Sequence, residues 1–161
     1  MAGPLGRRAL AELLGTAGAI AGAVLANLMF SLPALEVSTK VRTGGGLWLG
    51  EVVATFGLAL VVFGVVRSGR SGLAPFAVGA YITGAHFFTS STSFANPAVT
   101  VARTLSNTFA GIAPASVPGF VAFQLVGAVV AVGAIHALYP DATRVAINVV
   151  IPHDDSAKEG A

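Results

Sequence analysis

Asn96-Pro97-Ala98 is the segment of this sequence whose residue types point to a specific chemistry. Asn is a favoured N-cap and Pro is favoured at the first helical position, so the segment predicts a helix start. The apolar stretch from Pro97 to Leu105 would form roughly 13–14 Å of helix, about half the thickness of a bilayer core. We therefore expect a half-helix whose positive end and amide donor bind water or a neutral solute and oppose cations.

Two carboxylates occur in similar sequence contexts. Segments 10–16 and 49–55 share Leu, Glu and Thr at identical spacing, which places Glu12 and Glu51 one helical turn before a threonine on the same face. A carboxylate at the centre of a membrane span costs about 3 kcal/mol. We expect both to face the bundle interior and accept backbone hydrogen bonds; the alternative is an interfacial glutamate that reaches water.

The composition indicates a membrane protein. Of 161 residues, 55% are hydrophobic and 10% charged, with a mean hydropathy of +0.81, whereas soluble domains carry about 25% charged residues. The absence of cysteine excludes disulfides and thiol catalysis, and a net charge of +2 gives no reason to expect nucleic acid. Catalytic and phosphate-binding patterns do not stand out, so we expect no enzyme, no cofactor and no metal.

The spans that must position these groups follow from the apolar runs. About 20 apolar residues are needed to cross a bilayer, and the candidates are Ala9–Leu32, Leu47–Val66, Leu73–Phe88 and Val117–Tyr139. Residues 141–161 would form a polar cytoplasmic tail.

The basic residues predict the orientation. If the N-terminus is cytoplasmic, more arginines flank the spans inside than outside, which favours a multi-pass plasma-membrane protein with both termini cytoplasmic. In that orientation the inside residues are Arg7, Arg8, Arg67, Arg70 and Arg144, and the outside ones are Lys40, Arg42 and Arg103.

An Asn-Pro-Ala half-helix beside spans that carry glutamates resembles the aquaporin, or major intrinsic protein, family. The resemblance implies an all-α membrane fold, an aquaporin-like bundle of about four transmembrane helices and one re-entrant half-helix. Residues 1–140 would form the transmembrane domain, and residues 47–140 would match one complete repeat of the family. Residues 9–32 would be a hybrid of the first and third spans, so the chain is expected to be a truncated member that lacks most of the first repeat.

The resemblance also assigns site residues. Asn96, Pro97 and Ala98 would lie at the pore centre, and Gly84, Ser93 and Val99 would form the selectivity constriction. Val99 stands where the family pattern places an arginine, which implies a wide constriction like that of glycerol- and metalloid-permeable members. Two further residues stay open: His86 either lines the pore or does not, and Arg103 has either a surface or a functional role near the outer mouth.

Two functions remain at this stage. The first is a channel for passive passage of water or small neutral solutes such as polyols or undissociated metalloid acids, as a homo-oligomer (a tetramer in the family) in the lipid bilayer. The second is a non-conducting member that only packs in the membrane or interacts with partners, because the sequence holds one Asn-Pro-Ala segment.

Overall fold

The computed structural model describes the backbone of residues 4–140 and the side chains of residues 17–140. All regular secondary structure in this part is helical, as expected. The α-helices are α1 (Pro4–Met29), α2 (Gly45–Arg67), α3 (Ala74–Phe88), α4 (Pro97–Ala102) and α5 (Val117–Leu138); short 3-10 turns cover η1 (Ser71–Leu73), η2 (Arg103–Leu105) and η3 (Pro114–Ser116). The expected polar tail, with Arg144, lies outside the described residues, and so do the side chains of Arg7, Arg8 and Glu12.

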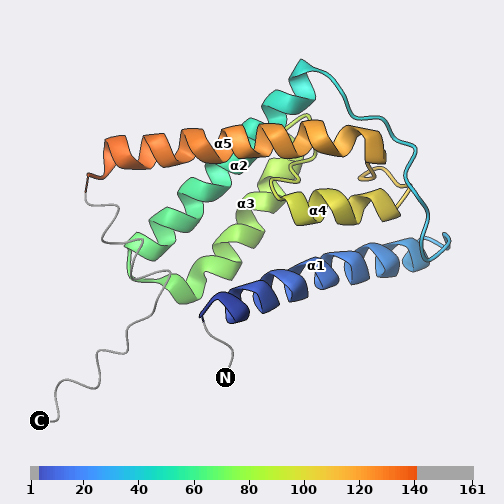
Figure 1. Cartoon of the computed structure of the whole chain (residues 1–161), viewed down its shortest axis with the longest axis horizontal. Coiled ribbons are helices and arrows are strands. Elements are labelled where there is room, and N and C mark those ends of the chain that lie inside the picture. Colours follow the sequence, from blue (N-terminus) through green and yellow to red (C-terminus); the bar gives the residue numbers. More distant parts are fainter. Residues whose placement is uncertain (1–3, 141–161) are drawn as a thin grey trace, which may run out of the picture.

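Helices α2 and α5 form the scaffold of the bundle and cross in direct contact. At the crossing, a Cβ on Gly127 would lie 2.6 Å from the Val52 carbonyl oxygen, so the missing side chain lets the two backbones approach closely. Helix α3 packs on α2, while α4 lies between α5 and α1 (Figure 1). The short helix therefore lies against longer helices on two sides, while its start remains exposed.

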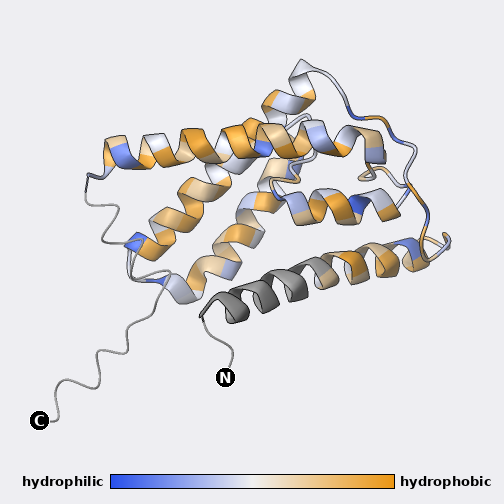
Figure 2. Cartoon of the chain, viewed as in Figure 1, coloured by the Kyte–Doolittle hydropathy of each residue, from blue (hydrophilic) through white to orange (hydrophobic). Residues whose placement is uncertain are grey.

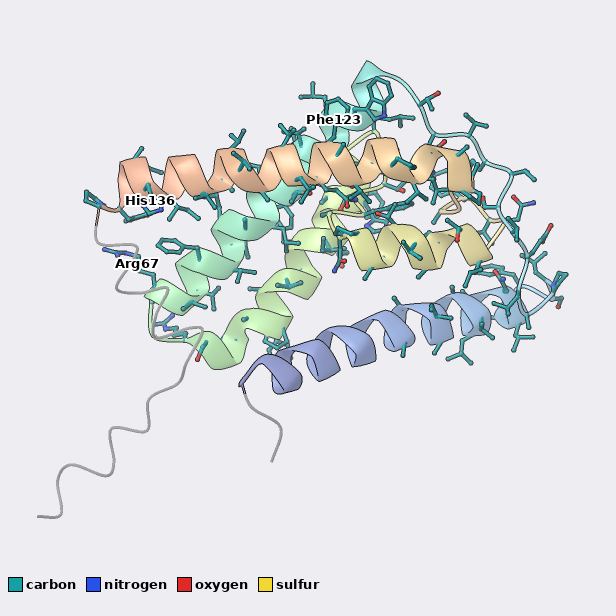
Figure 3. The ribbon with its side chains drawn as sticks, in the orientation of Figure 1. Arg67, Phe123 and His136 are labelled. Carbon is teal, nitrogen blue, oxygen red and sulfur yellow. The ribbon has the colours of Figure 1, made fainter. Side chains whose placement is uncertain are left out.

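Aromatic contacts fix both ends of the α2–α5 pair. Trp48 stacks on Phe123, with ring centroids 5.1 Å apart and an interplanar angle of 7°. At the opposite end the Arg67 guanidinium lies 4.5 Å from the centre of the Tyr139 ring. Figure 3 shows Phe123 near the start of α2, and Arg67 and His136 at the far end. The two helices therefore run in the same general direction.

Two helices of the described chain, Gly45–Arg67 and Pro114–Leu138, are long and apolar enough to cross a membrane, judged by length and composition. The apolar segment Ala17–Met29 is shorter, and α3, with 15 residues, spans about 22 Å. Hydrophobic residues run along these helices, and hydrophilic ones gather at their ends and in the loops (Figure 2). Large side chains such as Val129, 72% exposed, face outward from α5, as expected for a lipid-facing surface.

The first helix ends earlier than predicted, at Met29 rather than Leu32. Ser31 takes a left-handed φ of 57°, its N–H bonds the Leu28 carbonyl, and the Leu32 N–H bonds the Asn27 carbonyl. This pattern is a Schellman C-cap, and Pro33 follows it as the motif favours. The prediction extended the helix through residues 30–32 because they are hydrophobic. The helix ends earlier because the C-cap hydrogen bonds set its end.

Candidate functional site

The half-helix tip, Asn96–Ala98, has the predicted N-cap geometry. Asn96 has extended backbone angles, and its Oδ1 accepts a hydrogen bond from the Ala98 N–H at 2.8 Å. Asn96 and Pro97 are exposed. Among the described residues the Asn96 Nδ2 group donates to no acceptor, so the amide keeps two donors free for another molecule. The expected nine-residue half-helix is present, but its last turn, Arg103–Leu105, tightens to a 3-10 turn.

Glu51 of α2 supports the backbone just before the tip. It is fully buried, and its Oε1 and Oε2 accept hydrogen bonds from the N–H groups of Phe94 and Ala95 at 3.0 and 2.9 Å. The prediction that this glutamate faces the interior and finds backbone donors is confirmed. Hydrogen bonds to a charged group contribute about 1.5–3 kcal/mol each, which offsets the cost of burying the carboxylate.

Gln124 of α5 extends this support to the half-helix, a role that the sequence interpretation missed. Its Nε2 donates to Glu51 Oε2 at 2.6 Å and to Thr100 Oγ1 at 2.8 Å. The Thr100 hydroxyl in turn donates to the Asn96 carbonyl at 2.9 Å. The sequence could have indicated this role, because Gln124 is a polar residue within an apolar span, and such residues usually hydrogen-bond to another helix.

The approach loop, residues 91–95, is buried and holds unusual backbone angles. Thr92, Ser93 and Ala95 have φ values of 62°, 50° and 49°, and such left-handed residues cost of order 1–3 kcal/mol each at strained sites. The Ser93 N–H bonds Ser91 Oγ at 3.2 Å, and Glu51 binds the two N–H groups that follow. The loop is thus held by its surroundings in a conformation that its own residues disfavour.

The three expected constriction residues have different surroundings. Ser93 is buried, 2% exposed, and its hydroxyl has no partner among the described residues. Val99 packs against the core cluster of Phe94, Ile112 and Phe120. Gly84 lies on α3, and a Cβ added to it would have Phe88 as its nearest neighbour, 3.9 Å away.

The two residues that the sequence left open are also located. His86 is exposed, and its Nδ1 lies 2.9 Å from the Ile82 carbonyl of its own helix. Arg103 is half-buried at the end of the half-helix, beside a cavity described below. His86 therefore has a local contact that explains its position, whereas Arg103 needs a separate account.

Arg42 is buried, although the sequence suggested only a loop cation. Its Nε donates to the Gly111 carbonyl at 2.6 Å, Nη1 to Ser91 at 3.1 Å and Nη2 to Phe109 at 2.7 Å. Burial lowers the pKa of Arg42 below its usual value; the charge of Glu51 opposes this shift and that of Arg103 adds to it. The side chain joins three loops, including the approach loop, at one end of the bundle.

Asn27 attaches α1 to the end of the half-helix. It is 1% exposed; its Nδ2 donates to the carbonyls of Ala34 and Leu105 at 3.3 and 3.4 Å, and its Oδ1 accepts from the Ser106 hydroxyl at 2.6 Å. The site therefore comprises an exposed amide tip and buried polar groups from α1, α2 and α5 that hold it in place.

Comparison with known proteins gives one strong similarity. The chain is 53% identical over 133 residues to a protein named aquaglyceroporin AqpS from Rhizobium meliloti (strain 1021), an alignment that covers 81% of this chain. The matched part of this chain spans 57% of the length of that relative. No family model matches the chain, and no solved structure matches it.

Proposed function

Because the chain belongs to the aquaporin family, we propose that it serves as a membrane channel for the passive passage of water or small neutral solutes. Members of this family are channels, so the prediction that the chain is not an enzyme is confirmed. The observation that carries the proposal is the exposed Asn96 amide at the start of a half-helix, held by buried groups on two neighbouring helices.

The chemistry of the tip suits neutral solutes. Two free amide donors and a positive helix end can replace hydrogen bonds that a solute loses with water. The same positive end repels cations. We propose Asn96, Pro97 and Ala98 as the pore centre of a re-entrant half-helix within a bundle of about four spans, with both termini cytoplasmic in the plasma membrane.

We further propose that Gly84, Ser93 and Val99 set the constriction. None of them carries a charge, and Gly84 and Val99 offer no side-chain hydrogen bond, so they would admit solutes larger than water. This composition supports polyols or undissociated metalloid acids as substrates. The name of the relative, an aquaglyceroporin, agrees with that solute class.

A complete passage needs a surface opposite the tip. The described chain contains one Asn-Pro-Ala half-helix, and its tip is exposed. We propose a homo-oligomer in which a second half-helix faces the first. The burial of Ser93 favours a second candidate function, a non-conducting membrane or interaction protein, because this hydroxyl does not open to a passage within the described residues.

Proteoliposomes distinguish the two functions. Vesicles with the native chain should shrink faster than empty ones in an osmotic gradient, and should swell faster with glycerol. Asn96→Asp keeps a good N-cap but replaces the amide donors with a carboxylate, so rates should fall towards those of empty vesicles. Ser71→Asp, which adds the same charge in the exposed η1 turn, should keep the native rates.

If native and empty vesicles behave alike, conduction by this chain is rejected and the non-conducting function stands. Chemical crosslinking in the same vesicles then tests the assembly. A single defined oligomer supports a pore built from several chains, whereas a monomer contradicts it.

A further inference from the structure

A cavity of about 470 Å³ lies between the end of α1 and the segment that follows the half-helix. Its lining includes Ala26, Phe30, Leu32, Arg103, Thr108 and Phe109. Apart from the arginine and the threonine hydroxyl, these side chains are apolar. Small-molecule sites typically have volumes of about 300–1,000 Å³, apolar walls and a few polar groups. This cavity lies in that size range and is open on one side, where Phe30 and Phe109 are 75% and 77% exposed.

Arg103 is the charged group of this cavity. Among the described residues its guanidinium donates to no acceptor, and no carboxylate lies within ion-pair distance of it. The two acids whose side chains the structure describes have other partners: Glu36 accepts a hydrogen bond from Asn107 at 3.1 Å, and Glu51 binds the approach loop and Gln124. The Arg103 guanidinium is half-buried beside the cavity, and its five N–H donors are available to an external acceptor.

Two further cations surround the same segment. Lys40 Nζ donates to the Phe109 carbonyl at 2.8 Å and lies 4.5 Å from its ring centre, and Arg42 Nη2 donates to the same carbonyl. The Phe109 carbonyl therefore accepts hydrogen bonds from two cations, while its ring lines the cavity. Charges of one sign beside apolar walls raise the local concentration of the opposite ion.

We propose that this cavity binds a small organic carboxylate. The two carboxylate oxygens would accept a paired hydrogen bond from the planar fork of Arg103, a geometry that guanidinium supplies and ammonium does not. The short apolar body of the ligand would contact Phe30, Leu32 and Phe109. The site goes beyond passage of neutral solutes, because it holds an anion at one end of the bundle whether or not the chain conducts.

The experiment measures binding to the full chain in phosphatidylcholine nanodiscs by saturation-transfer NMR. The probes are 2-methylpropanoate and its neutral isostere 2-methylpropanamide, which have the same shape and differ in charge. The carboxylate should bind at least roughly tenfold more tightly than the amide, a difference of about 1.4 kcal/mol. Equal affinities, or no saturable carboxylate binding to the native chain, would overturn the proposal without any variant.

Variants then test the assignment to Arg103. Arg103→Gln should weaken carboxylate binding about tenfold or more, and Arg103→Lys should fall between it and the native chain. Arg70→Gln removes an exposed arginine from the turn after α2 and should change nothing. Ala26→Leu fills the cavity from α1 and leaves every cation in place, so it should abolish binding even if Arg103→Gln fails to fold. Unchanged affinity in a folded Arg103→Gln or Ala26→Leu chain would contradict the site.

Discussion

Glu51 of α2 and Gln124 of α5 meet beneath the half-helix, with Gln124 Nε2 2.6 Å from Glu51 Oε2. Both side chains are almost fully buried. Their contact joins the two scaffold helices at the same point where Glu51 holds the approach loop and Gln124 holds Thr100. The position of the tip therefore depends on polar groups that two other helices supply.

Removing the Gln124 side-chain amide should destabilise the fold. Gln124→Leu is expected to lower the free energy of unfolding by about 1–3 kcal/mol, because Glu51 and Thr100 both lose a buried donor. Denaturant titration of the purified chain, followed by circular dichroism, measures the change. Ala122→Leu, at an exposed position of the same helix, is the control and should be near neutral. A stability of Gln124→Leu equal to that of the control would contradict the role.

Neutralising the carboxylate should release the approach loop. In Glu51→Gln one oxygen becomes an amino group that cannot accept, so the Phe94 or the Ala95 N–H is left without its bond. Hydrogen exchange of these two amides should accelerate by roughly tenfold or more, as expected for the loss of about 1.5–3 kcal/mol.

Glu36→Gln, whose carboxylate bonds the Asn107 side chain, serves as the matched control for that measurement. It should leave exchange at Phe94 and Ala95 unchanged. Slow exchange in both variants would show that the loop holds its conformation without Glu51.

The crossing of α2 and α5 should not tolerate a larger residue. Gly127→Ala places a methyl group against the Val52 backbone and the Thr55 side chain, and overpacking of this kind costs about 1–3 kcal/mol. Gly133→Ala on the same helix has open space around it and should be neutral or stabilising by up to about 1 kcal/mol. Thermal unfolding of the pair gives the comparison; an equal Tm for both would mean that the helices can separate freely.

Loss of the buried guanidinium should loosen the loops at one end of the bundle. Arg42→Met removes donors from the carbonyls of Gly111, Ser91 and Phe109, with an expected loss of about 2–4 kcal/mol. Limited proteolysis should then cut residues 106–113 or 34–44 faster than in the native chain. Arg70→Met, at an exposed position, should leave the cleavage rate as it was.

The sequence predicted the features that depend on local rules. Asn96 and Pro97 fixed the helix start because capping is a property of a few adjacent residues, and the repeated Leu-Glu-Thr spacing identified Glu51 as a buried acceptor. The bounds of α2 and α5 came within one or two residues of those expected, since long apolar runs end at clear glycine, arginine and proline signals.

The features that depend on contacts distant in sequence were not predictable. Gln124 and Arg42 act on segments that lie 73 and 69 residues away, and no local pattern reports such a pairing. The left-handed angles at Thr92, Ser93 and Ala95 belong to residues that rarely adopt them. The end of α1 was predicted three residues too late because hydropathy does not report the backbone hydrogen bonds at Ser31 and Leu32 that end the helix.

Two hydrogen bonds to Glu51 of α2 hold the approach loop in left-handed backbone angles that its residues disfavour. The position of the loop therefore follows that of α2. Ser90, just before the loop, also donates its hydroxyl to the Gly46 carbonyl of α2. A tilt of α2 would therefore shift position 96 through Glu51. The lipid that surrounds α2, by setting its inclination, would thereby adjust where the free amide stands.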